Sequence, residues 1–135
     1  MSLEMLASTM GVQLRRDPHL PPGWWGAYDL ETHTVTLHPK LGPIQYRSTL
    51  AHELGHARFK HRESTTHTEW QASVWASRRL ITPEAFHDAV YWADTVTGVA
   101  SILEVMPADV ETYVTAMTSR ERRHLQKALA KAKTA

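Results

Sequence analysis

The sequence predicts an α+β fold, with a small antiparallel sheet early in the chain followed by a long helical part. Two observations carry this prediction. Segments that alternate in polarity and are rich in strand-forming residues lie between residues 12 and 38, where turn-forming residues separate them. Beyond residue 44, apolar residues instead recur at helical spacing. Strands grouped together and followed by a run of helices indicate α+β rather than α/β.

The first part of the chain should contain one short helix and three strands. We expect the helix at residues 2–10, where Leu3, Leu6 and Ala7 recur at helical spacing. Prolines and a glycine mark residues 17–23 as a loop. The expected strands are residues 12–15, 25–30 and 34–38, and the last two flank a turn near residues 31–33.

The remaining chain predicts six helices, at about residues 45–60, 69–80, 83–94, 97–104, 107–117 and 119–133. Thr82 followed by Pro83 is a typical helix start, and Pro107 suits the first turn of another helix. Thr118-x-x-Glu121 has the spacing of a capping box. We divide the chain into a core at residues 1–96 and a helical extension at 97–135, which either joins the same compact domain or forms a small subdomain.

Composition excludes several classes of protein. A chain of 135 residues fits one domain, and 42% apolar with 21% charged residues is typical of a globular fold. No cysteine is present, which excludes disulfides and thiolate metal ligands and fits a reducing compartment, so we expect a cytoplasmic protein. No signal peptide is expected, because the first residues lack a basic region followed by a long apolar stretch. No membrane partner is expected either, because no apolar run reaches the roughly 20 residues of a membrane span. A net charge of +1 gives no reason to expect direct binding to nucleic acid.

One motif carries metal chemistry. His52-Glu53-Leu54-Gly55-His56 is an H-E-x-x-H sequence in a predicted helix. Histidines at i and i+4 lie one turn apart on one face, so both can bind a single zinc ion. Glu53 lies beside the first ligand, where its carboxylate can take a proton from a water that the metal activates. An exposed helix face of histidine and glutamate is the alternative.

A third protein ligand is expected from another element, because catalytic zinc usually has three. Glu69, His67 and His61 are the candidates. Their chemistry ranks Glu69 first, at the start of the next helix, and His61 last, because it leaves the ligand face of the first helix. Glu69 has an alternative role, since Thr66-x-x-Glu69 also has the spacing of a capping box.

Two segments resemble one family. Arg47-Ser-Thr-Leu-Ala-His-Glu-Leu-Gly-His56 resembles the R-x-T-x-x-H-E-x-G-H helix of ImmA/IrrE-like zinc metallopeptidases. Glu69-x-x-Ala72-x-x-Trp75-Ala76 resembles the next helix of that family, E-x-x-A-x-x-F-A, and the resemblance covers residues 10–83. It implies a zincin-like fold and one Zn²⁺ per chain. It also implies Glu69 as the third ligand beside His52 and His56.

Zincins pair an extended substrate peptide with an edge strand beside the metal helix, and this resemblance implies such a strand here. We expect it at residues 34–38, that is, at Thr34, Val35, Thr36, Leu37 and His38. The alternative is an ordinary half-buried hairpin strand. The group that stabilises the oxyanion stays open, with Tyr28, His38, His61 and His67 as candidates.

Members of the family occur in phages, mobile elements and bacteria, where they relieve repression by cleaving helix-turn-helix repressors. The resemblance therefore implies a zinc-dependent endopeptidase that hydrolyses a peptide bond in a protein substrate, here a transcriptional repressor. The alternative is a non-catalytic zincin-fold antagonist, an antirepressor that inactivates the repressor by binding it. A pure binder would have no need of Glu53 as a base.

A DNA-binding regulator is a third hypothesis. Residues 100–110 have apolar spacing like that of a helix-turn-helix, but the helix at 107–117 carries Asp109 and Glu111 and no Lys or Arg. This charge disfavours contact with DNA. We expect the C-terminal helices instead to dock a folded protein partner away from the metal. Removal of the chain after about Thr97 should then leave zinc binding intact, provided that the truncated core still folds.

Overall fold

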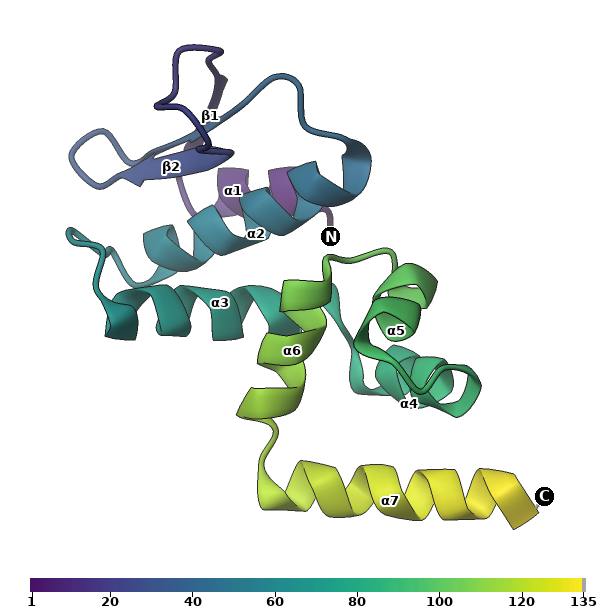
Figure 1. Cartoon of the computed structure of the whole chain (residues 1–135). Coiled ribbons are helices and arrows are strands. Elements are labelled where there is room, and N and C mark those ends of the chain that lie inside the picture. Colours follow the sequence, from purple (N-terminus) through teal and green to yellow (C-terminus); the bar gives the residue numbers. More distant parts are fainter. Residues whose placement is uncertain (135) are drawn as a thin grey trace.

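The computed structural model describes residues 1–134, which form seven helices and one three-stranded sheet (Figure 1). The first four elements are α1 (Leu3–Thr9), β1 (Gln13–Arg16), β2 (Gly26–Asp29) and β3 (Thr34–Leu37). The helices that follow are α2 (Pro43–Arg58), α3 (Thr66–Leu80), α4 (Pro83–Trp92), α5 (Val96–Leu103), α6 (Pro107–Ala116) and α7 (Ser119–Thr134). The expected α+β class is confirmed, with the sheet and the helices in the predicted order.

The sheet is mixed rather than wholly antiparallel. Its strand order is β1-β3-β2, and β3 runs parallel to β1 and antiparallel to β2. β3 takes the centre because it carries Val35 and Leu37, which are 0% and 1% exposed in the core beneath α2. The loop between β1 and β2 is long enough to carry the chain past β3, so the first two strands lie on opposite sides of the third.

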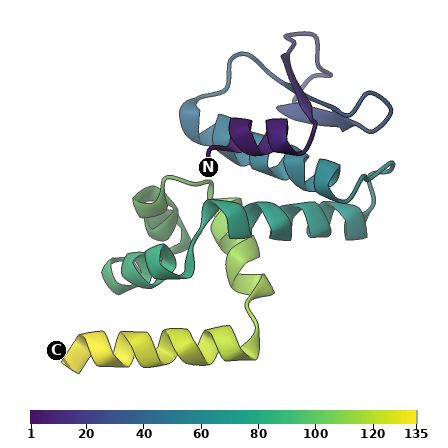
Figure 2. The same ribbon diagram turned by 180° about the vertical axis from the view of Figure 1, so that it is seen from behind.

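The helix α2 lies between the sheet and α3 (Figures 1 and 2). Pro43 stands in its first turn, and the Gly42 N–H donates to Gln45 Oε1, so the helix begins two residues before the expected start at 45. On the sheet side, Leu50 and Leu54 are fully buried with residues of α1 and β3. On the other side, Ala51 joins the core formed with the later helices. Both flanks of the helix that carries the H-E-x-x-H motif are therefore packed.

The helix α3 begins at Thr66, before the expected start at Glu69. Thr65 is the N-cap: its hydroxyl accepts from the Thr68 N–H, and the Thr68 hydroxyl accepts from the Thr65 N–H. The alternative in which Thr66 and Glu69 form the capping box is therefore wrong, because Thr65 and Thr68 already fill these positions. The Glu69 side chain is left available for α2.

Helices α4, α5 and α6 complete the core on the side of α2 that faces away from the sheet. Phe86, Val99, Val110 and Tyr113 are buried there in one cluster with Ala76 of α3 and Ala51 of α2. Residues of α5 and α6, beyond residue 96, share this core with Ala51 of α2. None of the helices within residues 1–134 combines the length and the apolar character that crossing a bilayer requires.

The last helix, α7, extends from the body of the molecule alongside α4 (Figure 1). The predicted capping box is confirmed: the Glu121 N–H donates to Thr118 Oγ1, and the Thr118 N–H donates to Glu121 Oε1. Glu121 also forms an ion pair with Arg78 of α3, at 3.1 Å. One residue thus caps α7 and ties it to the core.

Candidate metal centre

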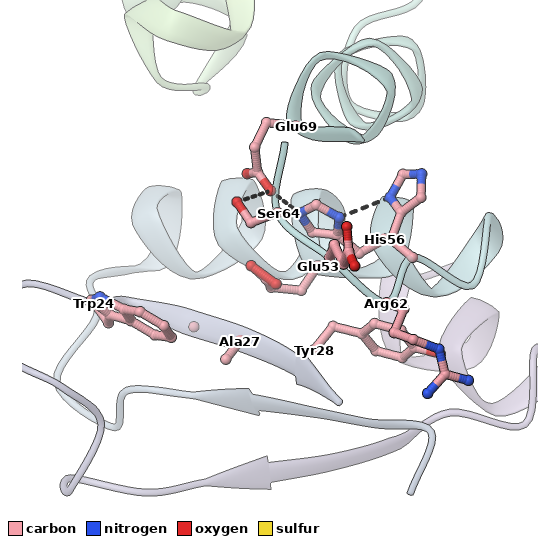
Figure 3. A pocket seen from close by; sticks show the side chains of 11 residues that line it. Trp24, Ala27, Tyr28, Glu53, His56, Arg62, Ser64 and Glu69 are labelled. Atoms are coloured by element: carbon pink, nitrogen blue, oxygen red, sulfur yellow. Dashed lines mark hydrogen bonds and ion pairs between the residues drawn. The ribbon is translucent and has the colours of Figure 1, made fainter. Parts of the chain in front are cut away.

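His52, His56 and Glu69 meet between α2 and α3. The two histidines lie one turn apart, and Glu69 approaches from the first turn of α3. His52 Nε2 is 3.0 Å from Glu69 Oε1, and His56 Nε2 is 3.0 Å from Glu69 Oε2. One ligand atom from each residue lies within 4.8 Å of the other two, a spacing that suits a single metal ion. Figure 3 shows Glu69 and His56 facing each other across this site.

A close approach of the two helices brings these groups together. A Cβ atom on Gly55 would lie 2.7 Å from the Ala72 carbonyl oxygen and 2.9 Å from the Ala72 Cα. Only glycine fits there without a shift of α3, because the atoms it would meet belong to the backbone. Ala72 lies three residues after Glu69, so this contact sets how far the Glu69 carboxylate stands from the histidines.

The protonation states of these groups fit a metal. Burial, followed by the proximity of His52, lowers the pKa of His56 and favours a neutral imidazole. Burial by itself would raise the pKa of Glu69, but the attraction of His56 and the hydrogen bond from His52 outweigh burial and lower it. Neutral imidazole and ionised carboxylate are the forms that bind metal ions.

The other two ligand candidates are not in this group. His67 is exposed and lies outside the cluster of ligand atoms. His61 is close, but its Nδ1 contacts His56 Nδ1 at 2.9 Å, on the side of the ring away from Glu69. His61 therefore supports a ligand rather than joining the cluster.

Glu53 is a buried carboxylate that faces the cleft. It is 8% exposed, and within residues 1–134 its carboxylate has neither a hydrogen bond nor an ion pair. Burial, followed by the negative charge of Glu69, raises its pKa from 4.5 to about 7. Among the described residues, no side-chain oxygen or nitrogen is both buried and without a hydrogen bond, so the Glu53 carboxylate oxygens are open to the cleft. A carboxyl group with a raised pKa at the wall of a cleft is typical of a residue that takes part in chemistry.

The cleft has two hollows that share Gly26 and Glu53. The first has a volume of about 340 Å³ and lies between β2, His56, Glu69 and residues 61–64 (Figure 3). The second has a volume of about 280 Å³ and is lined by His52 and by Ala108, Asp109 and Thr112 of α6. The expectation that the C-terminal helices lie away from the metal is therefore wrong for α6, which forms a wall of the cleft.

The predicted substrate strand at residues 34–38 is also wrong as an edge. Thr34, Val35, Thr36 and Leu37 form β3, which is paired with β1 on one side and with β2 on the other. The His38 N–H donates to the Trp25 carbonyl, so His38 is paired as well. A strand with both edges paired has no backbone groups left for a peptide.

The edge beside the metal helix belongs to β2 instead. Because the Trp25 carbonyl points to β3, the alternation of an antiparallel ladder turns the N–H and C=O groups of Gly26 and Tyr28 to the other side. Within the described residues, no strand pairs with β2 on that side, and Gly26 and Tyr28 line the first hollow. Gly26 allows this placement, since a Cβ there would lie 2.8 Å from Thr49 of α2.

Of the four candidates for the oxyanion group, Tyr28 and His61 line the first hollow, whereas His38 and His67 line neither of the two hollows. The Tyr28 hydroxyl lies 2.7 Å from His33 Nδ1. Sequence reasoning missed Gln71 and Ser73 of α3, which contact His61 and His52. The only feature of the sequence that could have pointed to them is that they follow Glu69 by two and four residues in the same helix.

Comparison with known proteins gives one match. The family model Peptidase_M78, described as the IrrE N-terminal-like domain, matches residues 5–106. This range contains the sheet, both helices of the metal centre and all four residues His52, Glu53, His56 and Glu69. No curated protein and no solved structure matches the chain.

Proposed function

The chain belongs to the Peptidase_M78 family of IrrE N-terminal-like domains, and from this membership we propose that it is a zinc-dependent endopeptidase. The observation that carries the proposal is the Glu53 carboxylate, which has no hydrogen bond or ion pair within residues 1–134 and faces the cleft beside three ligand atoms that lie within 4.8 Å of one another. His52, His56 and Glu69 would hold the metal. Two imidazoles and one carboxylate are a known ligand set of catalytic zinc, which keeps one position open.

When bound, zinc lowers the pKa of water towards roughly 7 and polarises the scissile carbonyl group. Glu53 then acts as the general base, accepting a proton from the attacking water. The same carboxyl group returns that proton to the amine that leaves when the peptide bond breaks. Glu53 suits this work because it faces the cleft and is not engaged by another side chain.

The edge of β2 would hold the substrate. Gly26 and Tyr28 offer N–H and C=O groups to an extended peptide, in the manner of an added strand. Such pairing needs an extended or locally unfolded segment of the substrate. The two hollows lie on either side of Gly26 and Glu53, so that side chains on both sides of the scissile bond would find room.

The substrate we propose is a helix-turn-helix transcriptional repressor. The resemblance to ImmA/IrrE-like peptidases supports this choice. A strand edge as short as β2, with four residues, provides few backbone bonds, which favours a partner held by additional contacts over a short free peptide.

The test is incubation of the zinc-loaded protein with the repressor encoded beside its gene, followed by mass spectrometry of the products. Fragments should appear with the wild type. Glu53→Gln should keep its zinc but cleave about 10²–10⁴ times more slowly, because the amide cannot accept the proton. A repressor that loses activity while staying full length would instead support the non-catalytic antagonist. Equal cleavage by Glu53→Gln and the wild type would refute the role of Glu53.

A further inference from the structure

A chain of hydrogen bonds runs from α3 to the far side of His56. His61 Nε2 lies 2.8 Å from Gln71 Oε1, and His61 Nδ1 lies 2.9 Å from His56 Nδ1. An amide oxygen only accepts, so His61 Nε2 must carry the hydrogen. A neutral His61 then has a bare Nδ1, which accepts from the Nδ1–H of His56. His56 Nε2 is thereby left with its lone pair, on the side where Glu69 stands.

The ring of His61 is held in place for this role. Lys60 adopts φ of 51° just after α2, and this left-handed residue turns the chain back on the helix. The His61 N–H then donates to the His56 carbonyl at 3.0 Å. The imidazole of His61 stacks on Phe59, with a centroid distance of 5.6 Å and an angle of 19° between the rings. Backbone, stacking and Gln71 all fix the same orientation.

His52 also has a hydrogen-bond partner behind its ring, in this case a single side chain that contacts it directly. Ser73 Oγ lies 3.2 Å from His52 Nδ1, while His52 Nε2 faces Glu69. A hydroxyl can accept a hydrogen bond, so Ser73 can hold the hydrogen on Nδ1 when a metal ion takes the place of the hydrogen bond between Nε2 and Glu69. Glu69, Gln71 and Ser73 all belong to α3, within five consecutive residues.

We propose that Gln71 and Ser73 are positioning residues that fix the tautomers of both histidine ligands, Gln71 through His61 and Ser73 directly. The proposal rests on the proposed function, in that it assigns these residues to a metal held by His52, His56 and Glu69. Acceptors behind the ligand histidines orient their rings and increase their basicity, and removing such an acceptor weakens metal binding about 10–100-fold. One helix thus supplies a ligand and the support for the other two.

The direct test is the protonation of the imidazole nitrogens in the zinc-loaded protein, read from ¹⁵N chemical shifts at pH 8, where histidines are ordinarily neutral. His61 should carry hydrogen on Nε2 and none on Nδ1, and His56 should carry hydrogen on Nδ1. Hydrogen on His61 Nδ1 in the wild type would overturn the proposal.

Zinc affinity, measured by competition with a chelator, provides the second test. Gln71→Met removes the acceptor at similar size and should weaken zinc binding about tenfold, as should Ser73→Ala. Gln71→Glu keeps an acceptor oxygen and should bind zinc at least as tightly as the wild type. Gln126→Met is the matched control, because it makes the same change on the exposed face of α7 and should leave the affinity unchanged.

The outcomes separate this proposal from the proposed function. If Gln71→Met binds zinc as tightly as the wild type, the proposed role of Gln71 is wrong, but the proposed function is unaffected. The same holds if Gln71→Met and Gln71→Glu lose zinc affinity equally. A wild-type chain without zinc affinity would overturn the proposed function and this inference together. The melting temperature of metal-free Gln71→Met should equal that of the metal-free wild type, so a lower value would assign Gln71 a merely structural role.

Discussion

Single side chains determine what the candidate centre can bind. Burial lowers the pKa of His56 and so favours its neutral form. The neighbouring histidines lower the pKa of Glu69 and so favour its ionised form. The first keeps a lone pair and the second keeps a negative charge. The 3.0 Å between each Nε2 atom and a Glu69 oxygen is the spacing of a hydrogen bond or ion pair, and a metal ion bound there would take the place of the hydrogen between the two atoms.

The role of Glu69 can be tested against that of His67. Glu69→Ala leaves two protein ligands, so zinc bound at stoichiometric amounts in the wild type should be lost on dialysis. His67→Ala should retain zinc, because His67 is exposed and outside the cluster. Metal analysis of both purified variants decides the question. Zinc retained in Glu69→Ala and lost in His67→Ala would reverse the assignment.

Helix packing and helix ends determine where these side chains stand. The N-cap at Thr65 starts α3 early enough for Glu69 to complete its first turn, and the contact between Gly55 and Ala72 brings α3 onto α2. Neither feature touches a metal ion. Both decide whether a carboxylate reaches the two histidines.

Gly55→Ala should therefore damage the fold and the metal site together. The added methyl group would stand 2.7 Å from the Ala72 carbonyl oxygen and force the helices apart. Overpacking of this kind typically costs about 1–3 kcal/mol. We expect a lower melting temperature of the metal-free protein and a larger zinc dissociation constant. Gly42→Ala is the control, since its nearest neighbour would lie 3.8 Å away; an equal loss of zinc affinity in both variants would refute the spacing argument.

The ion pair at the start of α7 predicts a dependence on pH. Hydrogen bonds from Arg78, then the backbone bond at Thr118, lower the pKa of Glu121 from 4.5 to about 2. A lowered pKa stabilises the folded state above pH 4.5, and this contribution disappears as the pH falls from 4.5 to 2. The pair is partly exposed to solvent, which screens it, so its contribution should stay below about 1 kcal/mol.

Glu121→Gln should accordingly lower the free energy of unfolding at pH 7, and the difference from the wild type should shrink as the pH approaches 2. Urea titrations across this range measure it. Glu111→Gln is the matched control, because Glu111 is exposed on α6 and forms no ion pair within residues 1–134. A difference that is constant with pH would contradict the assigned role of Glu121.

At the scale of the whole molecule, the metal centre is built from most of the chain. The sheet forms one side of the cleft, α2 and α3 carry the candidate ligands, and α6 closes the second hollow. The same α6 buries Val110 and Tyr113 in the core that holds Ala51 of α2 and Ala76 of α3. The cleft and the core therefore depend on the same helices.

Two truncated chains test which of the C-terminal helices the core requires. Ending the chain after Thr97 removes five core residues, namely Val99, Ala100, Val105, Val110 and Tyr113. Each large apolar side chain buried contributes about 1.5–3 kcal/mol, and total stability is only about 5–15 kcal/mol. This chain should not fold, so the condition attached to the expected zinc binding, a truncated core that still folds, is not met. Ending it after Met117 removes only α7 and should retain zinc binding, which circular dichroism and metal analysis would show; a folded, zinc-binding chain that ends at Thr97 would contradict this account.

The sequence by itself determined the features that depend on neighbours along the chain. The spacing of His52 and His56 places them on one helix face, Thr118 and Glu121 cap α7, and the order of strands and helices follows from local patterns. Even Glu69 could be ranked first from its chemistry and its place at a helix start. These features need only a few consecutive residues, and their hydrogen bonds close within one or two turns.

Only the tertiary structure decided which strand has a free edge, how closely α3 approaches α2, and that α6 lines the cleft. Each of these depends on competition between segments far apart in the chain. Val35 and Leu37 give β3 the central place because they bury more apolar surface there than a strand at the edge would, and β2 is left beside the metal helix. The alternation of polarity that identifies a strand is the same at the centre and at the edge of a sheet, so it does not reveal strand order.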